Sequence, residues 1–145
     1  MKKTSVPLVI AFTPDYFIPA ATCLYSIITS MQAEGELHVI CLLSEELPER
    51  LKLKIQLIGE GRTCYSFVNL QGKLQHIYID QKYTEAASYR LLLPDLLPEY
   101  KKVIYIDCDI IVRNDLVQLY HSIDLGMNYL AAVFEASMDF QLDHL

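Results

Sequence analysis

The 145-residue chain has the length of a single domain and can bury a sizeable apolar core. Its formal net charge of −6 at pH 7 argues against nucleic acid and against an anionic membrane surface as its general partner. Because the chain is acidic, a bound polyanion would need a metal ion or a local cationic side chain. The sequence contains no charge block, internal repeat or low-complexity run.

The cysteines and the start of the chain bear on its cellular compartment. The cysteines lie among apolar neighbours without C-x-x-C spacing, so we expect reduced, mostly buried thiols rather than disulfides or a zinc site. They are Cys23, Cys41, Cys64 and Cys108. Met1–Phe12 superficially resembles a signal peptide, but its apolar run is short and meets Thr13-Pro14-Asp15 at once, so we expect no cleaved leader. No segment approaches the roughly 18 apolar residues of a membrane span.

Strand and helix patterns alternate through the first half of the chain. Continuous apolar runs predict buried strands, and apolar residues spaced three or four apart predict helices. In chain order we expect a strand at Val6–Phe12, a turn at Thr13–Tyr16, a helix at Ile18–Met31, a strand at Leu37–Leu43, a helix from Ser44 to Gly59 and a half-exposed strand at Cys64–Leu70. This order predicts an α/β fold of three layers, α/β/α, with a mainly parallel central sheet.

The second half continues with shorter segments. In chain order we expect a strand at His76–Asp80, a helical segment at Thr84–Leu97 that Pro94 kinks or divides, a strand at Val103–Ile106, a helix at Leu116–Tyr120 capped by Asn114-Asp115 and a strand at Tyr129–Phe134. Every residue of Val103–Ile106 is β-branched or aromatic, so we expect this strand to be buried on both faces. The last eleven residues show no clear period.

Two aspartates follow the Val103–Ile106 strand directly. Asp107 and Asp109 fall where it should end, and parallel strands carry chemistry at their carboxyl ends. In extended chain, residues two apart point to the same side, so both carboxylates would face one cation while Cys108 faces away. Paired hard oxygen ligands suit Mg²⁺ or Mn²⁺. Ordinary turn or helix-cap chemistry also favours aspartate, and the residues alone leave both interpretations open.

Two other positions could carry chemistry. The turn Thr13–Tyr16 follows the first strand and offers a hydroxyl, a carboxylate and a ring that could pair with a base edge and stack on its face. The alternative is an ordinary strand-to-helix turn. Arg90, inside an apolar helical run, could snorkel to the surface, pair with an acid or bind a phosphate bidentately. The sequence lacks the signatures of hydrolase triads, P-loop kinases and dinucleotide dehydrogenases, and its four histidines show no ligand spacing.

Three sequence blocks together resemble family-8 retaining glycosyltransferases. The blocks are VIAFTPDYFIPAATCLYSI, ASYRLLLPDLLP and KKVIYIDCDIIVRNDL, and the similarity runs from about Pro7 to Phe134. That family comprises metal-dependent, nucleotide-sugar-using enzymes of the GT-A fold, including bacterial lipopolysaccharide glucosyl- and galactosyltransferases and glycogenin. The resemblance implies transfer of a hexose from a UDP-sugar to a hydroxyl of a glycan or glycolipid acceptor, with retained anomeric configuration. It also implies a cytoplasmic enzyme, peripheral at the inner membrane in its full-length form.

The resemblance assigns roles to residues of two blocks. Asp107 and Asp109 match the D-x-D motif that binds Mn²⁺, or Mg²⁺ in its place, at the donor diphosphate. Arg90 matches the arginine that contacts the donor near its phosphate and sugar, so these three are the expected catalytic residues. Cys108 occupies the middle of the D-x-D motif, whose backbone would lie near the ribose.

The first block matches the turn that holds uridine. Ala11, Thr13, Asp15 and Tyr16 fall on this turn, with Tyr16 where a ring stacks on uracil. Many family members carry Asp and Asn where this chain has Thr13 and Asp15. The base and ribose contacts are therefore expected to differ in detail.

The resemblance also predicts what the 145 residues lack. The family's acceptor segment and its third metal ligand, a histidine well downstream of D-x-D, have no counterpart, because His144 is too close behind the motif. We therefore expect residues 1–145 to form one domain, the nucleotide-sugar-binding portion of a truncated catalytic domain, which self-associates through exposed surface. Two alternatives are a catalytically inert donor-binding fragment and, more remotely, a haloacid-dehalogenase-like phosphatase, in which D-x-D also follows an apolar strand.

Overall fold

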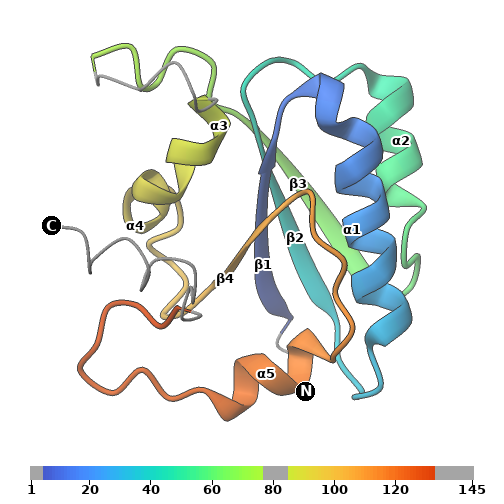
Figure 1. The fold of residues 1–145 in the computed structure, drawn as a ribbon, viewed down its shortest axis with the longest axis vertical. Coiled ribbons are helices and arrows are strands. Elements are labelled where there is room, and N and C mark those ends of the chain that lie inside the picture. Colours follow the sequence, from blue (N-terminus) through green and yellow to red (C-terminus); the bar gives the residue numbers. More distant parts are fainter. Residues whose placement is uncertain (1–4, 77–84, 133–145) are drawn as a thin grey trace, which may run out of the picture.

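Four parallel strands form one sheet in this computed structural model, which describes residues 5–76 and 85–132. The order of the strands across the sheet is β3-β2-β1-β4 (Figure 1). Their bounds are β1 Val6–Phe12, β2 Leu37–Leu43, β3 Thr63–Asn69 and β4 Ile104–Asp107. The predicted bounds of the first two strands are confirmed.

Strand β1 lies at the centre of the described sheet and is buried along its whole length. Its side chains alternate between two apolar clusters, as the two-residue period of a strand requires. Leu8 and Ile10 belong to the first-face core, the cluster that packs against α1 (Phe17–Ser30). Val9 and Ala11 belong to the second-face cluster, on the opposite face of the sheet. A strand that is apolar at every position therefore serves two cores at once.

Helices cover both faces of the sheet (Figure 1). The helices on the first face are α1, α2 (Glu49–Gln56) and α5 (Leu116–Ser122). The helices on the second face are α3 (Glu85–Ser88), the 3-10 helix η2 (Tyr89–Leu92) and α4 (Leu93–Leu96). The predicted three-layer α/β/α architecture with a parallel sheet is confirmed.

Prolines set two helix boundaries in this fold. Pro94 lies in the first turn of α4, where its missing N–H costs no helical hydrogen bond, so the predicted division of Thr84–Leu97 is confirmed from Glu85 onward. The helix predicted from Ser44 begins only at Glu49, because Pro48 precedes it in an extended conformation. The same helix ends at Gln56 and is followed by a turn that includes Gly59.

The prediction that strand Val103–Ile106 is buried on both faces is wrong. Strand β4 is only half-buried, and within the described residues it pairs with β1 alone, so it is an edge strand. Apolar composition identified the strand, but burial depends on neighbours along the sheet that the local sequence does not contain.

The strand expected at Tyr129–Phe134 is not formed at residues 129–132, which are irregular. Tyr129 and Leu130 are exposed there, and no strand among the described residues lies beside them to accept their backbone hydrogen bonds. Residues 133 and 134 lie outside the described part of the chain. The strand expected at His76–Asp80 also lies outside it, except for His76, which ends a turn.

The four cysteines are free, as predicted, and three of them are buried. Cys64 is exposed. Burial raises the pKa of the Cys41 thiol far above its usual range, so this thiol stays protonated. Across residues 5–76 and 85–132, no helix is both long enough and apolar enough to cross a membrane.

Candidate functional site

The strand order creates a switch point between β1 and β4. The chain builds the sheet in one direction from β1 to β2 to β3, and then returns to place β4 on the other side of β1. In open α/β sheets, ligands bind beyond the carboxyl ends of the strands at such a switch point. The register pairs Ala11 of β1 with Asp107 of β4. The residues that follow each strand therefore emerge side by side, at the edge of the sheet that is formed by the carboxyl ends of its strands.

The turn after β1 forms a short 3-10 helix, η1 (Pro14–Tyr16), that leads directly into α1. It is closed by a hydrogen bond of 2.9 Å from the Tyr16 N–H to the Thr13 carbonyl. Tyr16 is 46% exposed as a residue and Asp15 is also exposed, so both are open to a ligand. Ala11 is buried in the second-face cluster, which leaves its backbone as the group that could contact a ligand.

The D-x-D motif forms a turn at the end of β4. Asp107 is the last residue of the strand, and Cys108 and Asp109 already belong to the turn, so the extended geometry predicted for all three is wrong. The expected alternation nevertheless holds for burial: the two aspartates are exposed, and Cys108 packs into the first-face core. Burial, with Asp109 as a second cause, raises the pKa of the Cys108 thiol.

Arg90 reaches the D-x-D motif from η2. Its Nη2 atom lies 3.0 Å from Oδ1 of Asp107, and the two side chains are 45% and 55% exposed. Of the three alternatives that the sequence left open, the structure shows pairing with an acid. Water screens a pair this exposed, so it adds little to stability.

Besides the pair with Asp107, two contacts hold the Arg90 side chain in this position, and a buried neighbour holds its backbone. Its Nε–H donates to the Ala87 carbonyl at 2.8 Å, and its guanidinium carbon lies 4.8 Å from the centre of the Tyr105 ring. The preceding residue, Tyr89, is fully buried and donates its hydroxyl to the Leu70 carbonyl at 3.3 Å. The buried ring fixes the backbone from which Arg90 extends toward the edge of the sheet.

The two aspartates fit part of a divalent-cation site. Their carboxylates are exposed hard oxygen ligands on one turn, the type that Mg²⁺ and Mn²⁺ prefer. Asp109 makes no side-chain hydrogen bond to another described residue, so both of its oxygens are available. Within the described ranges, no group of three or more His, Cys, Asp and Glu side chains gathers that could hold a metal ion. The remaining ligands would have to come from water, substrate or other residues.

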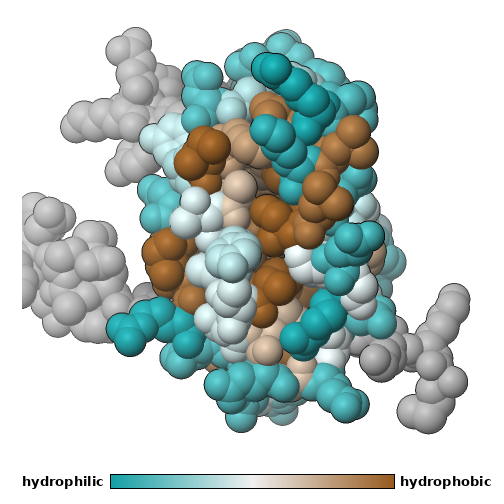
Figure 2. Space-filling model, turned by 90° about the vertical axis from the view of Figure 1, so that its right-hand side faces the viewer, coloured by the Kyte–Doolittle hydropathy of each residue, from teal (hydrophilic) through white to brown (hydrophobic). Residues whose placement is uncertain are grey.

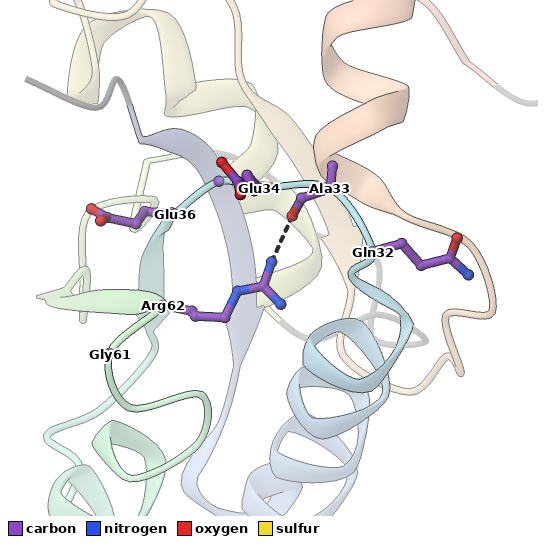
Figure 3. Close-up of a pocket in the computed structure, with 7 residues that line it drawn as sticks. Gln32, Ala33, Glu34, Glu36, Gly61 and Arg62 are labelled. Atoms are coloured by element: carbon purple, nitrogen blue, oxygen red, sulfur yellow. Dashed lines mark hydrogen bonds between the residues drawn. The ribbon is translucent and has the colours of Figure 1, made fainter. Parts of the chain in front are cut away.

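A separate hollow lies at the opposite edge of the sheet (Figure 3). It is lined by the residues that connect α1 to β2 and by those that precede β3, which are Gln32, Ala33, Glu34, Gly35, Glu36, Gly61 and Arg62. Arg62 donates to the Ala33 carbonyl at 2.7 Å and to the Met31 carbonyl at 3.4 Å. The arginine thus caps the carboxyl end of α1, which is a structural role.

Sequence reasoning missed the roles of Ser26 and Ser30, and it found only part of the role of Asp115. Ser26 and Ser30 of α1 bind the backbone of Val112, just beyond the D-x-D turn. Asp115 was predicted as a helix cap, and it does accept the Val117 and Gln118 N–H groups at 2.8 and 3.1 Å. Its other oxygen accepts two further N–H groups at the end of α1, at 2.7 and 2.6 Å. No local pattern signals such long-range bonds.

A family model described as "Glycosyl transferase family 8" matches residues 7–144. The chain belongs to this family. Family 8 membership places the chain in the class of glycosyltransferases and favours the glycosyltransferase interpretation of D-x-D over the phosphatase one.

Two curated relatives show how much of a longer protein the chain represents. General stress protein A of Bacillus subtilis (strain 168) is 24% identical over an alignment of 149 positions, which covers 100% of the chain and 52% of that protein. Glycosyltransferase GlyE of Streptococcus pneumoniae serotype 4 is 32% identical over 103 positions, covering 64% of the chain and 23% of GlyE. The chain thus spans about half the length of the first relative.

Solved structures confirm the GT-A fold. The bifunctional glycosyltransferase WbbM matches with a TM-score of 0.81 and 24% identity, over 96% of the chain and 24% of WbbM. The galactosyltransferase LgtC, solved in complex with donor and acceptor sugar analogs, matches with a TM-score of 0.75 and 22% identity. That match covers 94% of the chain and 49% of LgtC.

Proposed function

We propose that residues 1–145 form the donor-binding portion of a metal-dependent, retaining hexosyltransferase that uses a UDP-sugar. The observation that carries this proposal is the register of Ala11 with Asp107 at the β1–β4 switch point, which brings the Thr13–Tyr16 turn and the D-x-D turn to one edge of the sheet. Family 8 membership and the fold match to LgtC support it.

The two carboxylates would hold the cation. Asp107 and Asp109 would supply two oxygen ligands to Mn²⁺ or Mg²⁺, and the donor diphosphate would supply others. A bound ion of this kind neutralises charge that develops on the departing diphosphate. Such stabilisation speeds transfer because that charge grows in the transition state.

Arg90 would act on the same leaving group. Its guanidinium is held at the edge of the site by Ala87 and Tyr105, and a planar guanidinium binds phosphate oxygens in pairs. Binding to the donor would require Arg90 to release or share its contact with Asp107. Breaking the contact would cost little free energy, because the pair is half-exposed and water already weakens it.

The turn after β1 would hold the nucleoside. Tyr16 would stack on uracil, while Asp15 and the Thr13 hydroxyl would bind polar groups of the base or ribose. Thr13 and Asp15 replace the Asp and Asn of many family members, so their hydrogen bonds would follow a different pattern. The backbones of Ala11 and Cys108 would line the same edge.

The acceptor and the cellular setting belong to the same proposal. We expect a glycan or glycolipid hydroxyl as the acceptor, and a cytoplasmic enzyme that is peripheral at the inner membrane. Fractionation of cells that produce the protein tests the second point, since a membrane-associated enzyme sediments with the membranes and is released by salt.

Isothermal titration calorimetry tests the donor site. We expect the chain to bind UDP in the presence of Mn²⁺ and to lose this binding when EDTA is added or when Asp107 is replaced by Asn. Asp124→Asn is a matched control, because Asp124 is an exposed aspartate after α5 whose hydrogen bond is to Gly126. The proposal fails if UDP binding is absent, or if Asp107→Asn binds metal and UDP as well as the unmodified chain.

A catalytically inert donor-binding fragment remains the second candidate, because the chain spans about half of its first curated relative. Metal-dependent UDP binding without sugar transfer to any acceptor favours this candidate. Transfer by the 145-residue chain alone rules it out.

Self-association of the chain also stays a prediction. The outer surface of α1 and α2 exposes large apolar side chains among polar ones (Figure 2). These are Ile18, Tyr25, Leu53 and Leu57. Exposed apolar surface favours association. Sedimentation velocity at rising concentration checks this, and a monomer throughout would contradict it.

A further inference from the structure

One face of α1 points hydrogen-bonding side chains at the segment that carries D-x-D. Cys23, Ser26 and Ser30 are spaced three and four residues apart, so they lie on the same side of the helix. Each of the three side chains contacts the backbone of the stretch from Asp107 to Val112.

Two serines form hydrogen bonds with the backbone of Val112, one with its N–H and one with its carbonyl. The Ser26 hydroxyl accepts the Val112 N–H at 2.9 Å and donates to the Cys23 carbonyl at 2.7 Å. The Ser30 hydroxyl donates to the Val112 carbonyl at 2.9 Å. The chain just after D-x-D is therefore fastened to two successive turns of α1.

The start of the same stretch is also held by α1. The Cys23 thiol donates to the Asp107 carbonyl, with a distance of 3.8 Å between sulfur and oxygen. One helix thus contacts both ends of the segment that contains the two exposed carboxylates.

Helix α1 also begins at the Thr13–Tyr16 turn. Phe17, its first residue, directly follows η1. The turn proposed for the base and the turn proposed for the metal are therefore joined by one helix, in addition to the pairing of β1 with β4. A change in the position of α1 relative to either turn would alter the distance between the base-binding turn and the metal-binding turn.

We propose that Ser26 and Ser30 are positioning residues, which fix the D-x-D carboxylates relative to the base-binding turn and so set the affinity for a metal–nucleotide complex. This inference rests on the proposed donor site. The serines touch neither metal nor nucleotide, and they act through the backbone of Val112. Without these hydrogen bonds, the backbone of residues 110–113 gains conformational freedom. Ligand binding must then order this backbone, and the lost entropy weakens the affinity.

Single alanine substitutions separate this role from simple helix stability. Ser26→Ala and Ser30→Ala each remove one hydroxyl and leave a Val112 backbone group without its partner. Thr29→Ala is the matched control, because Thr29 lies on the same helix and, among the residues that the structure describes, its hydroxyl donates to the Tyr25 and Ser26 carbonyls alone, both at 3.0 Å. Ser30→Thr restores a hydroxyl at the same position.

Two measurements give the readout. Calorimetry of UDP binding at saturating Mn²⁺ should show affinity weakened about three- to tenfold for each serine variant, the size of one lost hydrogen bond. The Thr29→Ala variant should stay within about twofold, and Ser30→Thr should recover most of the loss. Hydrogen exchange without any ligand should show faster exchange of the Val112 amide in Ser26→Ala.

The outcomes separate this inference from the proposed function. If the unmodified chain fails to bind UDP with Mn²⁺, the proposed donor site and the inference both fall. If it binds, and the serine variants lose unfolding free energy but keep their affinity, the serines are only structural and the inference alone is overturned. Should Ser26→Ala fail to fold, Ser30→Ala and Ser30→Thr still decide the question by the same comparison.

Discussion

Arg90 and Asp107 form an ion pair in which Nη2 lies 3.0 Å from Oδ1. The resemblance assigned Asp107 to the metal ion and Arg90 to the donor near its phosphate and sugar, and the structure pairs the two side chains with each other. A guanidinium and a divalent cation would compete for the same carboxylate oxygen. The pair is half-exposed, so the competition is weak enough for a metal ion to win.

Replacing Arg90 should therefore affect metal and nucleotide in opposite directions. We expect Arg90→Gln to tighten Mn²⁺ binding to the nucleotide-free chain about two- to fivefold, because a competing cation is lost. We expect the same variant to bind UDP with Mn²⁺ more weakly, because a phosphate contact is lost. Electron paramagnetic resonance of free Mn²⁺ measures the first effect and calorimetry the second.

Arg50→Gln is the charge-matched control for this experiment, since Arg50 is exposed on α2. An equal gain in Mn²⁺ affinity in this control would mean that net charge alone explains the effect. Stronger UDP binding by Arg90→Gln would contradict the phosphate contact.

Loss of either D-x-D carboxylate should abolish transfer in the full-length protein. Asp107→Ala and Asp109→Ala each remove one of the two hard oxygen ligands that the chain would give to the cation. The measurement is the rate of sugar release from a UDP-sugar at increasing Mn²⁺. Turnover equal to that of the unmodified enzyme in either variant would refute the metal assignment.

The Tyr16 ring should contribute to nucleoside binding and leave diphosphate binding unchanged. We expect Tyr16→Ala to weaken UDP binding about tenfold, since stacking of a base on an aromatic ring is worth roughly 1–3 kcal/mol. Tyr16→Phe keeps the ring and should stay close to the unmodified chain. Inorganic diphosphate with Mn²⁺ should bind all three proteins alike, and a parallel loss of diphosphate binding in Tyr16→Ala would point to a disturbed fold.

Asp115 should be a large single contributor to stability. The residue is only 9% exposed, and its carboxylate accepts four backbone N–H groups and ties the end of α1 to the start of α5. We expect Asp115→Ala to lower the unfolding free energy by about 3 kcal/mol or more, because buried donors lose their partners. Chemical denaturation measures this, and Asp124→Asn should change it little.

The same carboxylate makes stability depend on pH. Burial by itself raises the pKa of Asp115, but the four N–H groups, from Ala33, Gln118, Gln32 and Val117, together outweigh burial and lower it below its ordinary value of 3.8. Its contribution is therefore fully present above about pH 4 and is lost as the pH falls through the lowered pKa of the folded state. The difference in unfolding free energy between the unmodified chain and Asp115→Asn should shrink below pH 4.

Local sequence was sufficient to predict the core strands and to place the Thr13–Tyr16 turn and Asp107 at one edge of the sheet. Val6–Phe12 and Leu37–Leu43 are apolar runs bounded by polar residues, a pattern that predicts a buried strand, and both form buried strands here. The β-α-β order fixes parallel pairing, which sends the residues after β1 and after β4 to one edge. The common location of the Thr13–Tyr16 turn and Asp107 follows from that order.

Features that depend on distant partners could not be predicted from the sequence. Val103–Ile106 reads as a fully buried strand, but its burial is decided by what lies beside it in the sheet. The hydrogen bonds of Ser30 and Ser26 with Val112 join residues separated by 82 and 86 positions. A serine on a helix has many uses, and its own neighbours in sequence do not reveal which backbone it meets.

The position of β4 beside β1 has a consequence for how the protein folds. Strands β1, β2 and β3 pair with their neighbours along the chain, whereas β4 pairs residues beyond position 100 with residues before position 12. Contacts between such distant segments form late, because the long loop between them must close first. We therefore expect the two halves of the candidate site to come together in the last strand pairing of the described sheet, after α1 has a core to pack against. A ligand that bridges these halves would act on this closing step, slowing the release of β4 more than the unfolding of β1, β2 and β3.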